Sequence, residues 1–416
     1  MRQIELKPNE SEISPADKPE NQSRADAVTR RLWPLNSDAL CARAQQRTGL
    51  KDFGDPPIEP ALSTLGSSLE NEADLHPLGR FLMRGHLLSI LETRLRLAAL
   101  WREQFGALSP VPRPVFVTGM PRSGSTFLHE LLSQDPENRS PRVWEIMFPL
   151  PAPAAGAEFR DSRIRKTNFR LWCFRRMVPQ ADEVYPVRAV TPHECVAIHS
   201  FTLMSEEFVT TCRIPTYEKF LRATGLQAAY AWQKRFLQHL QSRGPAKRWI
   251  LKSPDHLYAL EELFSVFPDA IVIQTHRNPL DVLRSSLRLT EALHGLFGRP
   301  IPVAEHQERE TRLLADTMER SIRFRDLHPE LAGRFMDVAY SELISDPLAI
   351  VRRIYQHMEC PLTAAAAERM QQFVGTRSRY HHRRYPTLAD LGLDVAAEVR
   401  RFQKYCQRFG VPCRPA

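Results

Sequence analysis

The chain lacks several features that would assign it to a protein class at once. It contains no run of about 18 apolar residues, so we expect no transmembrane helix. Its seven cysteines are scattered and form neither a CxxC pair nor the spacing of a zinc site. Residues 1–22 are polar and acidic without an apolar centre, which is not the pattern of a secretory signal. We therefore expect reduced thiols, no resident metal and a cytoplasmic protein.

Lysine is scarce although the chain is basic. Only 9 of the 57 basic residues are Lys, and the formal net charge is +9. The guanidinium group of Arg matches phosphate and sulfate oxygens, so the composition favours a small anionic ligand. Net charge alone does not indicate a nucleic acid, and we expect none as a partner. With 416 residues, of which 43% are hydrophobic, the chain can bury a full core, and a homo-oligomer stays open.

The composition divides the chain into three predicted parts. Residues 1–35 are polar and are expected to be a disordered leader. Residues 36–110 carry apolar positions at helical spacing and are expected to be a helical extension. Residues 111–416 are expected to form one α/β domain. Inside it, residues 141–190 are rich in Pro and Arg with weak periodicity and are expected to be irregular, within an insertion at 141–245 that forms a substrate pocket.

Short β-branched and aromatic runs in the third part each lead into a turn and an apolar helical pattern. These expected strands are residues 114–118, 248–252, 270–275 and 335–339. Strands that alternate with helices form a parallel sheet with helices on both faces. The predicted fold is therefore a three-layer α/β/α domain with a central parallel sheet.

The segment GMPRSGST, from Gly119 to Thr126, is the most informative one. It follows an expected strand and opens an expected helix, where glycines let backbone N–H groups turn toward an anion and the helix N-terminus adds a positive end. The spacing of Gly119 and Gly124 is that of a P-loop, but Ser125 stands at the Lys position of the Walker pattern and the basic residue is Arg122. The loop thus predicts anion binding and argues against an ordinary ATPase or GTPase.

This loop, with the helix and the Asp135-Pro136 pair that follow, resembles the 5′-phosphosulfate loop of sulfotransferases, which use 3′-phosphoadenosine 5′-phosphosulfate (PAPS) as donor. The resemblance implies the P-loop-like fold of that family. It also implies that Arg122 contacts the 5′-phosphate and the bridging oxygen, and that Phe127 takes the place of the aromatic residue that stacks on adenine. The residues that it implies for the phosphosulfate cradle are Pro121, Arg122, Ser123, Gly124, Ser125 and Thr126.

A second motif supports the resemblance. The segment HRNPLDVLRSS places Ser285 eight residues after Arg277, as in the 3′-phosphate motif of the family. Arg277 ends an expected strand, and open α/β sheets bind ligands at that edge. The resemblance further implies that Tyr340 approaches the adenine, and that Arg383 and Arg384 belong to a basic loop over the 3′-phosphate.

Sulfuryl transfer needs cations around the moving group and a base for the acceptor. The resemblance implies Lys252, at the end of a strand, as one cation beside Arg122. For the base, two residues stay open: Glu145, shortly after the helix of the loop, and His256, shortly after Lys252. The pair His193-Glu194 could enter the acceptor pocket, although we expect the end of a surface helix there.

These observations predict an enzyme that moves a sulfuryl group from PAPS to a hydroxyl or amine of a small molecule or lipid by in-line displacement, without a metal. Two alternatives stay open. One is a P-loop nucleotide kinase or NTPase, against which the missing Walker Lys counts. The other is an inactive relative that binds 3′,5′-ADP without catalysing transfer.

Overall fold

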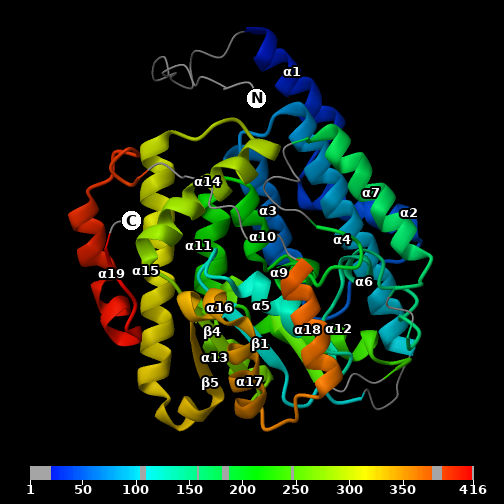
Figure 1. Ribbon diagram of the computed structural model, residues 1–416. Coiled ribbons are helices and arrows are strands. Elements are labelled where there is room, and N and C mark those ends of the chain that lie inside the picture. The colour runs from blue at the N-terminus through cyan, green and yellow to red at the C-terminus, as the bar shows by residue number, and fades with distance from the viewer. Residues whose placement is uncertain are drawn as a thin grey trace.

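The computed structural model describes residues 20–103, 109–156, 159–179, 187–244, 248–376 and 387–414. A central sheet is covered by helices on both faces, and the N-terminal helices lie together along one side (Figure 1). The three-layer α/β/α architecture predicted from the sequence is confirmed, with a helical N-terminal region.

The sheet has five strands in the order β2-β3-β1-β4-β5, and every pairing is parallel. The strands are β1 (Val115–Gly119), β2 (Asn138–Arg139), β3 (Arg248–Lys252), β4 (Ile271–His276) and β5 (Phe335–Ala339). Val117 is in register with Lys252 on one side and Ile273 on the other, and Thr275 is in register with Val338. The carboxyl ends of the strands therefore meet at one edge of the sheet, where such folds bind their ligands.

The helices fall into two groups along the chain. Those before and within the insertion are α1 (Glu20–Leu32), α2 (Ser37–Thr48), α3 (Glu59–Asn71), α4 (Pro77–Glu103), α5 (Ser125–Leu132), α6 (Val143–Met147), α7 (Arg163–Met177), α9 (Val196–His199), α10 (Glu206–Thr211), α11 (Pro215–Thr224) and α12 (Gln227–Leu240). Those that follow are α13 (Leu260–Val266), α14 (Pro279–Phe297), α15 (Val303–Leu327), α16 (Tyr340–Ser345), α17 (Pro347–His357), α18 (Ala364–Thr376) and α19 (Val395–Phe409). Short 3₁₀ turns lie at Ser200–Thr202, Pro254–Tyr258 and Pro329–Arg334.

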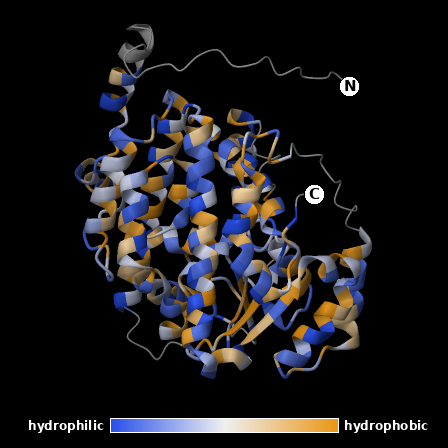
Figure 2. Ribbon diagram, turned by 90° about the vertical axis from the view of Figure 1, so that its left-hand side faces the viewer, coloured by the Kyte–Doolittle hydropathy of each residue, from blue (hydrophilic) through white to orange (hydrophobic). Residues whose placement is uncertain are grey.

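The alternation of side chains along β1 separates two cores. Phe116 belongs to a large apolar cluster with the N-terminal helices and α12, whereas Val115 and Val117 pack on the other face with α5 and α17. All five residues of β1 are buried, as expected for the middle strand of a parallel sheet. In Figure 2 the strands are mostly orange, whereas the helices carry blue and orange residues in alternation. The loop at the carboxyl end of β1 thus begins at a strand that is buried on both faces.

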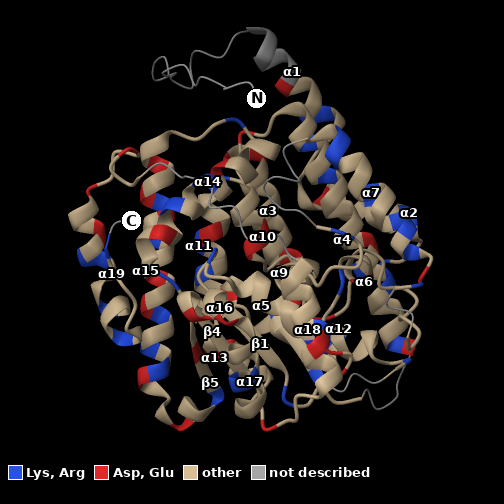
Figure 3. Cartoon of the chain, viewed as in Figure 1, with Lys and Arg blue, Asp and Glu red and all other residues tan. Residues whose placement is uncertain are grey.

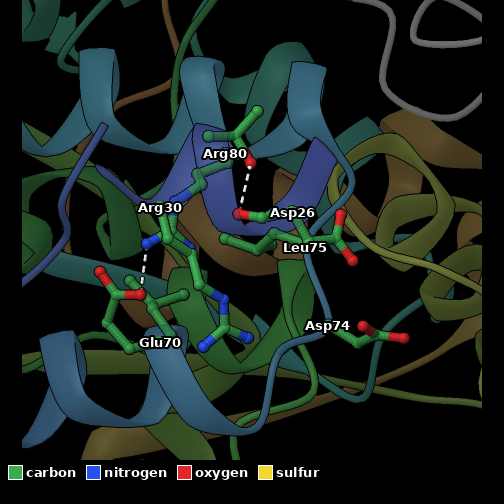
Figure 4. Close-up of a pocket in the computed structure, with 8 residues that line it drawn as sticks. Asp26, Arg30, Glu70, Asp74, Leu75 and Arg80 are labelled. Atoms are coloured by element: carbon green, nitrogen blue, oxygen red, sulfur yellow. Dashed lines mark hydrogen bonds and ion pairs between the residues drawn. The ribbon is translucent and has the colours of Figure 1, made fainter. Parts of the chain in front are cut away.

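Charged side chains fix the N-terminal helices to one another. Arg80 of α4 is 3% exposed and forms an ion pair with Glu70 of α3. Asp26 of α1 pairs with Arg299 at 2.9 Å. These acids and Arg80 line a small polar pocket (Figure 4). The lining residues come from α1, α3 and α4 and the turn after α3, and none belongs to the two predicted anion-binding motifs, so we assign the pocket a structural role.

The structure differs from the sequence prediction at three places. Helix α1 lies within the predicted disordered leader, and its Asp26 pairs with Arg299. Strand β2 is only two residues long, which is too short for a recognisable pattern. Helix α7 spans much of the segment expected to be irregular; eight of its residues are exposed, so its apolar inner positions give a weak period.

Candidate functional site

The loop between β1 and α5 is shaped by two glycines. Gly119 has φ 149°, and a Cβ on it would lie 2.1 Å from Oγ1 of Thr275. Gly124 has φ 92°, and a Cβ there would lie 3.1 Å from the ring of Tyr340. Both backbone angles disfavour any side chain, and both close approaches join this loop to the neighbouring strands. The loop therefore lies directly against the carboxyl end of β4 and the first residue after β5.

Three residues of the two sequence motifs converge at this edge with Tyr340, which follows β5. Arg122 has φ 66°, a strained angle for a residue with a side chain, and its Nε donates to Oγ of Ser285 over 3.2 Å. Arg277 donates from Nη1 to the carbonyl of Arg122 over 2.8 Å, and its guanidinium lies 4.3 Å from the ring centre of Tyr340. The structure thus brings two guanidinium groups, a hydroxyl and an aromatic ring together beside the loop.

Hydroxyl groups attach the buried side of the loop to β4. Ser123 is fully buried, and its Oγ lies 2.6 Å from Oγ1 of Thr275, which also donates to the carbonyl of Thr118 over 3.1 Å. Ser125 and Thr126 form the first turn of α5, where backbone N–H groups have no partner inside the helix. Thr126 is exposed, so this helix end is open to a ligand. Sequence reasoning did not identify Thr275, because a Thr inside a strand carries no pattern.

Phe127 lies differently from the rest of the loop. It is 7% exposed, packs in the core beside α5, and its ring is stacked on Phe373 of α18 at a centroid distance of 6.3 Å. Pro121, in the turn itself, is half-buried. Adenine stacking by Phe127 stays a prediction. Arg383 and Arg384, expected over the 3′-phosphate, lie outside the described residues.

The next strand on the other side of β1 presents a buried cation. Lys252 ends β3, is 3% exposed, and its Nζ donates to Oε1 of Glu194. The Glu194 side chain keeps 17% exposure. The backbone N–H of Cys195 donates to the carbonyl of Lys252 over 2.9 Å, which fixes the two segments together. An ion pair therefore lies at the site, and its carboxylate is the partly exposed partner.

Glu145, one of the two predicted bases, is fully buried. Its Oε2 accepts from the backbone N–H of Arg142 over 2.8 Å and its Oε1 from Arg139 over 3.2 Å, so it caps the first turn of α6. Burial raises the pKa of Glu145, and Arg139 and the Arg142 backbone oppose that shift. Both carboxylate oxygens are thus engaged in holding α6, and the role of Glu145 as base stays a prediction.

His256, the other predicted base, lies inside a buried polar cluster. It is 0% exposed, and its Nδ1 lies 2.7 Å from Oη of Tyr230. Burial, helped by the nearby charges of His199 and Lys252, lowers the pKa of His256 to about 3, so the ring is neutral at pH 7. Its neighbour Asp255 lies 3.4 Å from Nδ1 of His199; burial would raise the pKa of Asp255, but the bond from His199 and the nearby imidazoles lower it. His256 as base likewise stays a prediction.

Among the residues that the structure describes, no three His, Cys, Asp or Glu side chains gather as metal ligands would. No helix in these same ranges has the length and apolar character to cross a bilayer. The chemistry available at the site is that of cations, hydroxyls, backbone N–H groups and one carboxylate. Such a set binds and stabilises anions and accepts one proton.

Comparisons with known proteins agree with this geometry. The profile of the Sulfotransferase family matches residues 114–364, which include both motifs, Lys252 and Tyr340. A curated relative, omega-hydroxy-beta-dihydromenaquinone-9 sulfotransferase Stf3 of Mycobacterium bovis, is 28% identical over 286 residues, which cover 65% of this chain and 69% of that protein. The protein of the same name from Mycobacterium tuberculosis matches equally.

Solved structures match over most of the chain. Sulfotransferase STF9 from Mycobacterium avium superposes with a TM-score of 0.83 at 28% identity, covering 91% of this chain and 98% of that one. Sulfotransferase STF1 from Mycobacterium tuberculosis H37Rv superposes with a TM-score of 0.79 at 28% identity, covering 89% of this chain and 100% of that one. The family profile spans the strands that carry the loop, the second motif and the buried Lys. This chain, predicted from two motifs to resemble sulfotransferases, belongs to the sulfotransferase family.

Proposed function

We propose that this sulfotransferase takes its sulfuryl group from PAPS and transfers it to a hydroxyl of an apolar, lipid-like acceptor. The observation that carries the donor assignment is the convergence of Arg122, Arg277, Ser285 and Tyr340 beside the loop. Two guanidinium groups suit a ligand with two separate anionic groups, and an aromatic ring beside them suits the adenine ring of a nucleotide.

The order of strands gives the donor a direction. The groups of the site lie at the carboxyl ends of β3, β1, β4 and β5, which are neighbours in that order: Lys252 ends β3, and the loop, Arg277 and Tyr340 come after β1, β4 and β5. Adjacent strands are about 4.8 Å apart, so these groups are spread over roughly 15 Å, the reach of an extended nucleotide. We place the phosphosulfate at the loop, its sulfuryl end toward Lys252, the 3′-phosphate at Arg277 and Ser285, and the adenine toward Tyr340.

For the acceptor we propose Glu194 as the base. The acceptor oxygen attacks sulfur in line, its proton passes to the Glu194 carboxylate, and the bond between sulfur and the 5′-phosphate oxygen breaks to release 3′,5′-ADP. Lys252 and Arg122 offset the negative charge on the moving group and on the leaving phosphate. Glu194 is better placed than Glu145 because it contacts Lys252 directly and is partly exposed.

The acceptor class rests on two lines of support. The mycobacterial relatives act, by name, on a hydroxylated dihydromenaquinone, which is a lipid. In this chain, Glu194 belongs to residues 192–199, which pair with the start of α6 through the bridge between Arg142 and Pro192. The insertion predicted from the sequence to hold the acceptor therefore contains the proposed base, which lies against Lys252.

The donor assignment is tested by calorimetric titration with 3′,5′-ADP, 5′-AMP and ATP with magnesium. We expect binding of 3′,5′-ADP that is at least ten-fold tighter than that of 5′-AMP, and a further loss of about ten- to hundred-fold in Arg277→Ala. Arg96→Ala is the matched control, since Arg96 lies on α4 and is half exposed. Equal binding of 5′-AMP, or preference for ATP with magnesium, refutes the assignment. Binding without transfer to any hydroxylated acceptor supports the inactive relative.

A further inference from the structure

Helix α7 has an outer face unlike any ordinary solvated helix. Its sequence, RIRKTNFRLWCFRRM, contains five Arg, one Lys and no acidic residue. Phe169 is 64% exposed and Trp172 is 56% exposed, and their rings are stacked at 6.0 Å. Exposing aromatic rings to water is energetically unfavourable. A stacked pair of exposed rings on one face therefore indicates a surface that binds a partner.

Helical spacing places these rings between cations. Arg165, Phe169, Trp172 and Arg176 are separated by four, three and four residues, so they form one stripe along the helix. All four side chains are exposed. The opposite face is the attached one: Thr167 is buried, and Phe174 packs against the small apolar cluster of Val178 and Leu296, as does Leu82 of α4. The stripe therefore points away from the body of the protein.

The rest of the helix extends this surface. Lys166 and Arg170 both lie over the ring of Phe148, at 4.2 and 4.9 Å from its centre. Phe159, just before α7, is 66% exposed. In Figure 3, blue residues follow α7 along its length. Aromatic rings among Arg and Lys side chains match the interfacial region of a bilayer, where rings lie at the headgroup level and cations meet lipid phosphates.

Helix α19 provides an internal comparison, since it has the same length of 15 residues and is also basic. Three of its four cations are paired with acids: Arg401 with Glu398, Lys404 with Glu319 and Arg408 with Asp326. Its rings Phe402 and Tyr405 are buried. Helix α19 thus neutralises most of its charge and buries two of its rings, whereas on the outer stripe of α7 the rings are exposed and no ion pair forms with an acid in the part of the chain that the structure describes.

We propose that α7 docks the protein onto an anionic membrane surface, with Phe169 and Trp172 in the headgroup region and Arg165 and Arg176 on lipid phosphates. The position of α7 gives this contact a use. The chain runs from α6 into α7, and after α7 it comes back beside α6. The N–H of Trp144 in α6 donates to the carbonyl of Ala189 over 3.0 Å. A few residues later it reaches the Glu194 segment. Docking would bring the acceptor side of the enzyme to the bilayer.

Vesicle co-sedimentation of the full chain, without donor or acceptor, tests the proposal independently of the proposed reaction. We expect binding to vesicles with 30% phosphatidylglycerol and much weaker binding to pure phosphatidylcholine. Each cation near an anionic surface contributes about five-fold, so Arg165→Gln with Arg176→Gln is expected to weaken binding about 25-fold. The matched control, Arg400→Gln with Arg408→Gln in α19, removes the same charge and is expected to change binding less than three-fold.

Tryptophan fluorescence reports the insertion itself. Of the six tryptophans, Trp172 is the exposed one, Trp33 is half-buried, and Trp101, Trp144, Trp232 and Trp249 are at most 5% exposed. Anionic vesicles are expected to shift the emission to the blue and to allow quenching by brominated lipid. Trp172→Phe is expected to keep vesicle binding and to lose the shift.

Several results would overturn the proposal. Binding that is equal in the α7 and α19 double variants would place the membrane contact elsewhere. A Trp172 signal unchanged by vesicles would show that the stripe stays in water. A concentration-dependent dimer that Trp172→Ala abolishes, without vesicle binding, would assign the stripe to a second copy. Binding of an RNA oligomer through α7, again without vesicle binding, would assign it to a nucleic acid.

Discussion

Replacing Glu194 by Gln distinguishes the proposed base from a residue that only supports the fold. Gln keeps an oxygen to accept the hydrogen bond from Lys252, whose side chain is 4% exposed, but it cannot take a proton at neutral pH. A general base contributes about 10²- to 10⁴-fold to the rate, so we expect kcat to fall by roughly 100-fold or more. Because Lys252 loses only the charge of its partner, the free energy of unfolding should fall by about 1–3 kcal/mol.

Glu145→Gln is the matched variant, because it makes the same chemical change in the other carboxylate. Glu145 is fully buried and accepts two hydrogen bonds, from Arg142 and Arg139. Hydrogen bonds to a charged group contribute about 1.5–3 kcal/mol each, and Gln retains part of them. We therefore expect a loss of about 2–4 kcal/mol in the free energy of unfolding, with kcat of the folded enzyme within three-fold of the unchanged chain.

The assay measures release of 3′,5′-ADP from PAPS against a panel of hydroxylated lipids and phenols, with 3′,5′-ADP affinity by calorimetry and stability by urea unfolding. For Glu194→Gln, 3′,5′-ADP affinity should stay within about three-fold, since the carboxylate is assigned to the acceptor. Full turnover by Glu194→Gln would refute the reasoning. Loss of turnover in Glu145→Gln at unchanged stability would transfer the role of base to Glu145.

Two further outcomes follow from the geometry. Gly124→Ala puts a Cβ 3.1 Å from Tyr340 at φ 92°, so the affinity for 3′,5′-ADP, measured by calorimetry, should fall about ten-fold or more. Gly156→Ala is the control: its φ is 72° and no atom lies within 4 Å of the added Cβ, so this affinity should stay unchanged. Burial lowers the pKa of His129 to about 3, so its contribution to stability is full above pH 6.5 and is lost as the pH falls. Between pH 6 and 4.5 the free energy of unfolding should fall less steeply in His129→Gln than in the unchanged chain, by about 1.4 kcal/mol per pH unit. Identical slopes of the two proteins in urea unfolding would contradict the lowered pKa of His129.

The sheet and the donor side of the site were predictable because local patterns determine them. The strand ending at Lys252 and the strand at residues 335–339 agree with the sequence prediction, because each contains β-branched, aromatic or other large apolar residues that are buried in the sheet. Arg277 and Ser285 are eight residues apart on a strand end and its helix, so their meeting beside Arg122 follows from the fold class. Motif spacing and strand order together bring these side chains to one edge of the sheet.

The acceptor side was not predictable in the same way. Glu194 follows a Pro and a His in a segment without periodicity. Contacts with distant segments hold it beside Lys252: the bridge between Pro192 and Arg142 and the bond from Cys195 to the carbonyl of Lys252. Glu145 follows the loop helix closely in sequence, yet its carboxylate turns back onto the backbone of Arg142. Contacts between distant segments decide both cases, and a single sequence does not display them. Helix α7 was missed because its aromatic residues face outward.

The attachment of residues 192–199 to β3 explains how donor and acceptor can be held in one register. The backbone of Lys252 accepts from Cys195 while its side chain donates to Glu194, so a single residue fixes both the position and the charge of the proposed base. The same strand pairs with β1 through the register of Val117 and Lys252, two residues before Gly119 begins the loop. A shift of β3 by one residue would turn Lys252 to the other face of the sheet and take Glu194 with it. In the proposed reaction, the pairing of these two buried strands therefore determines where the base lies relative to the donor.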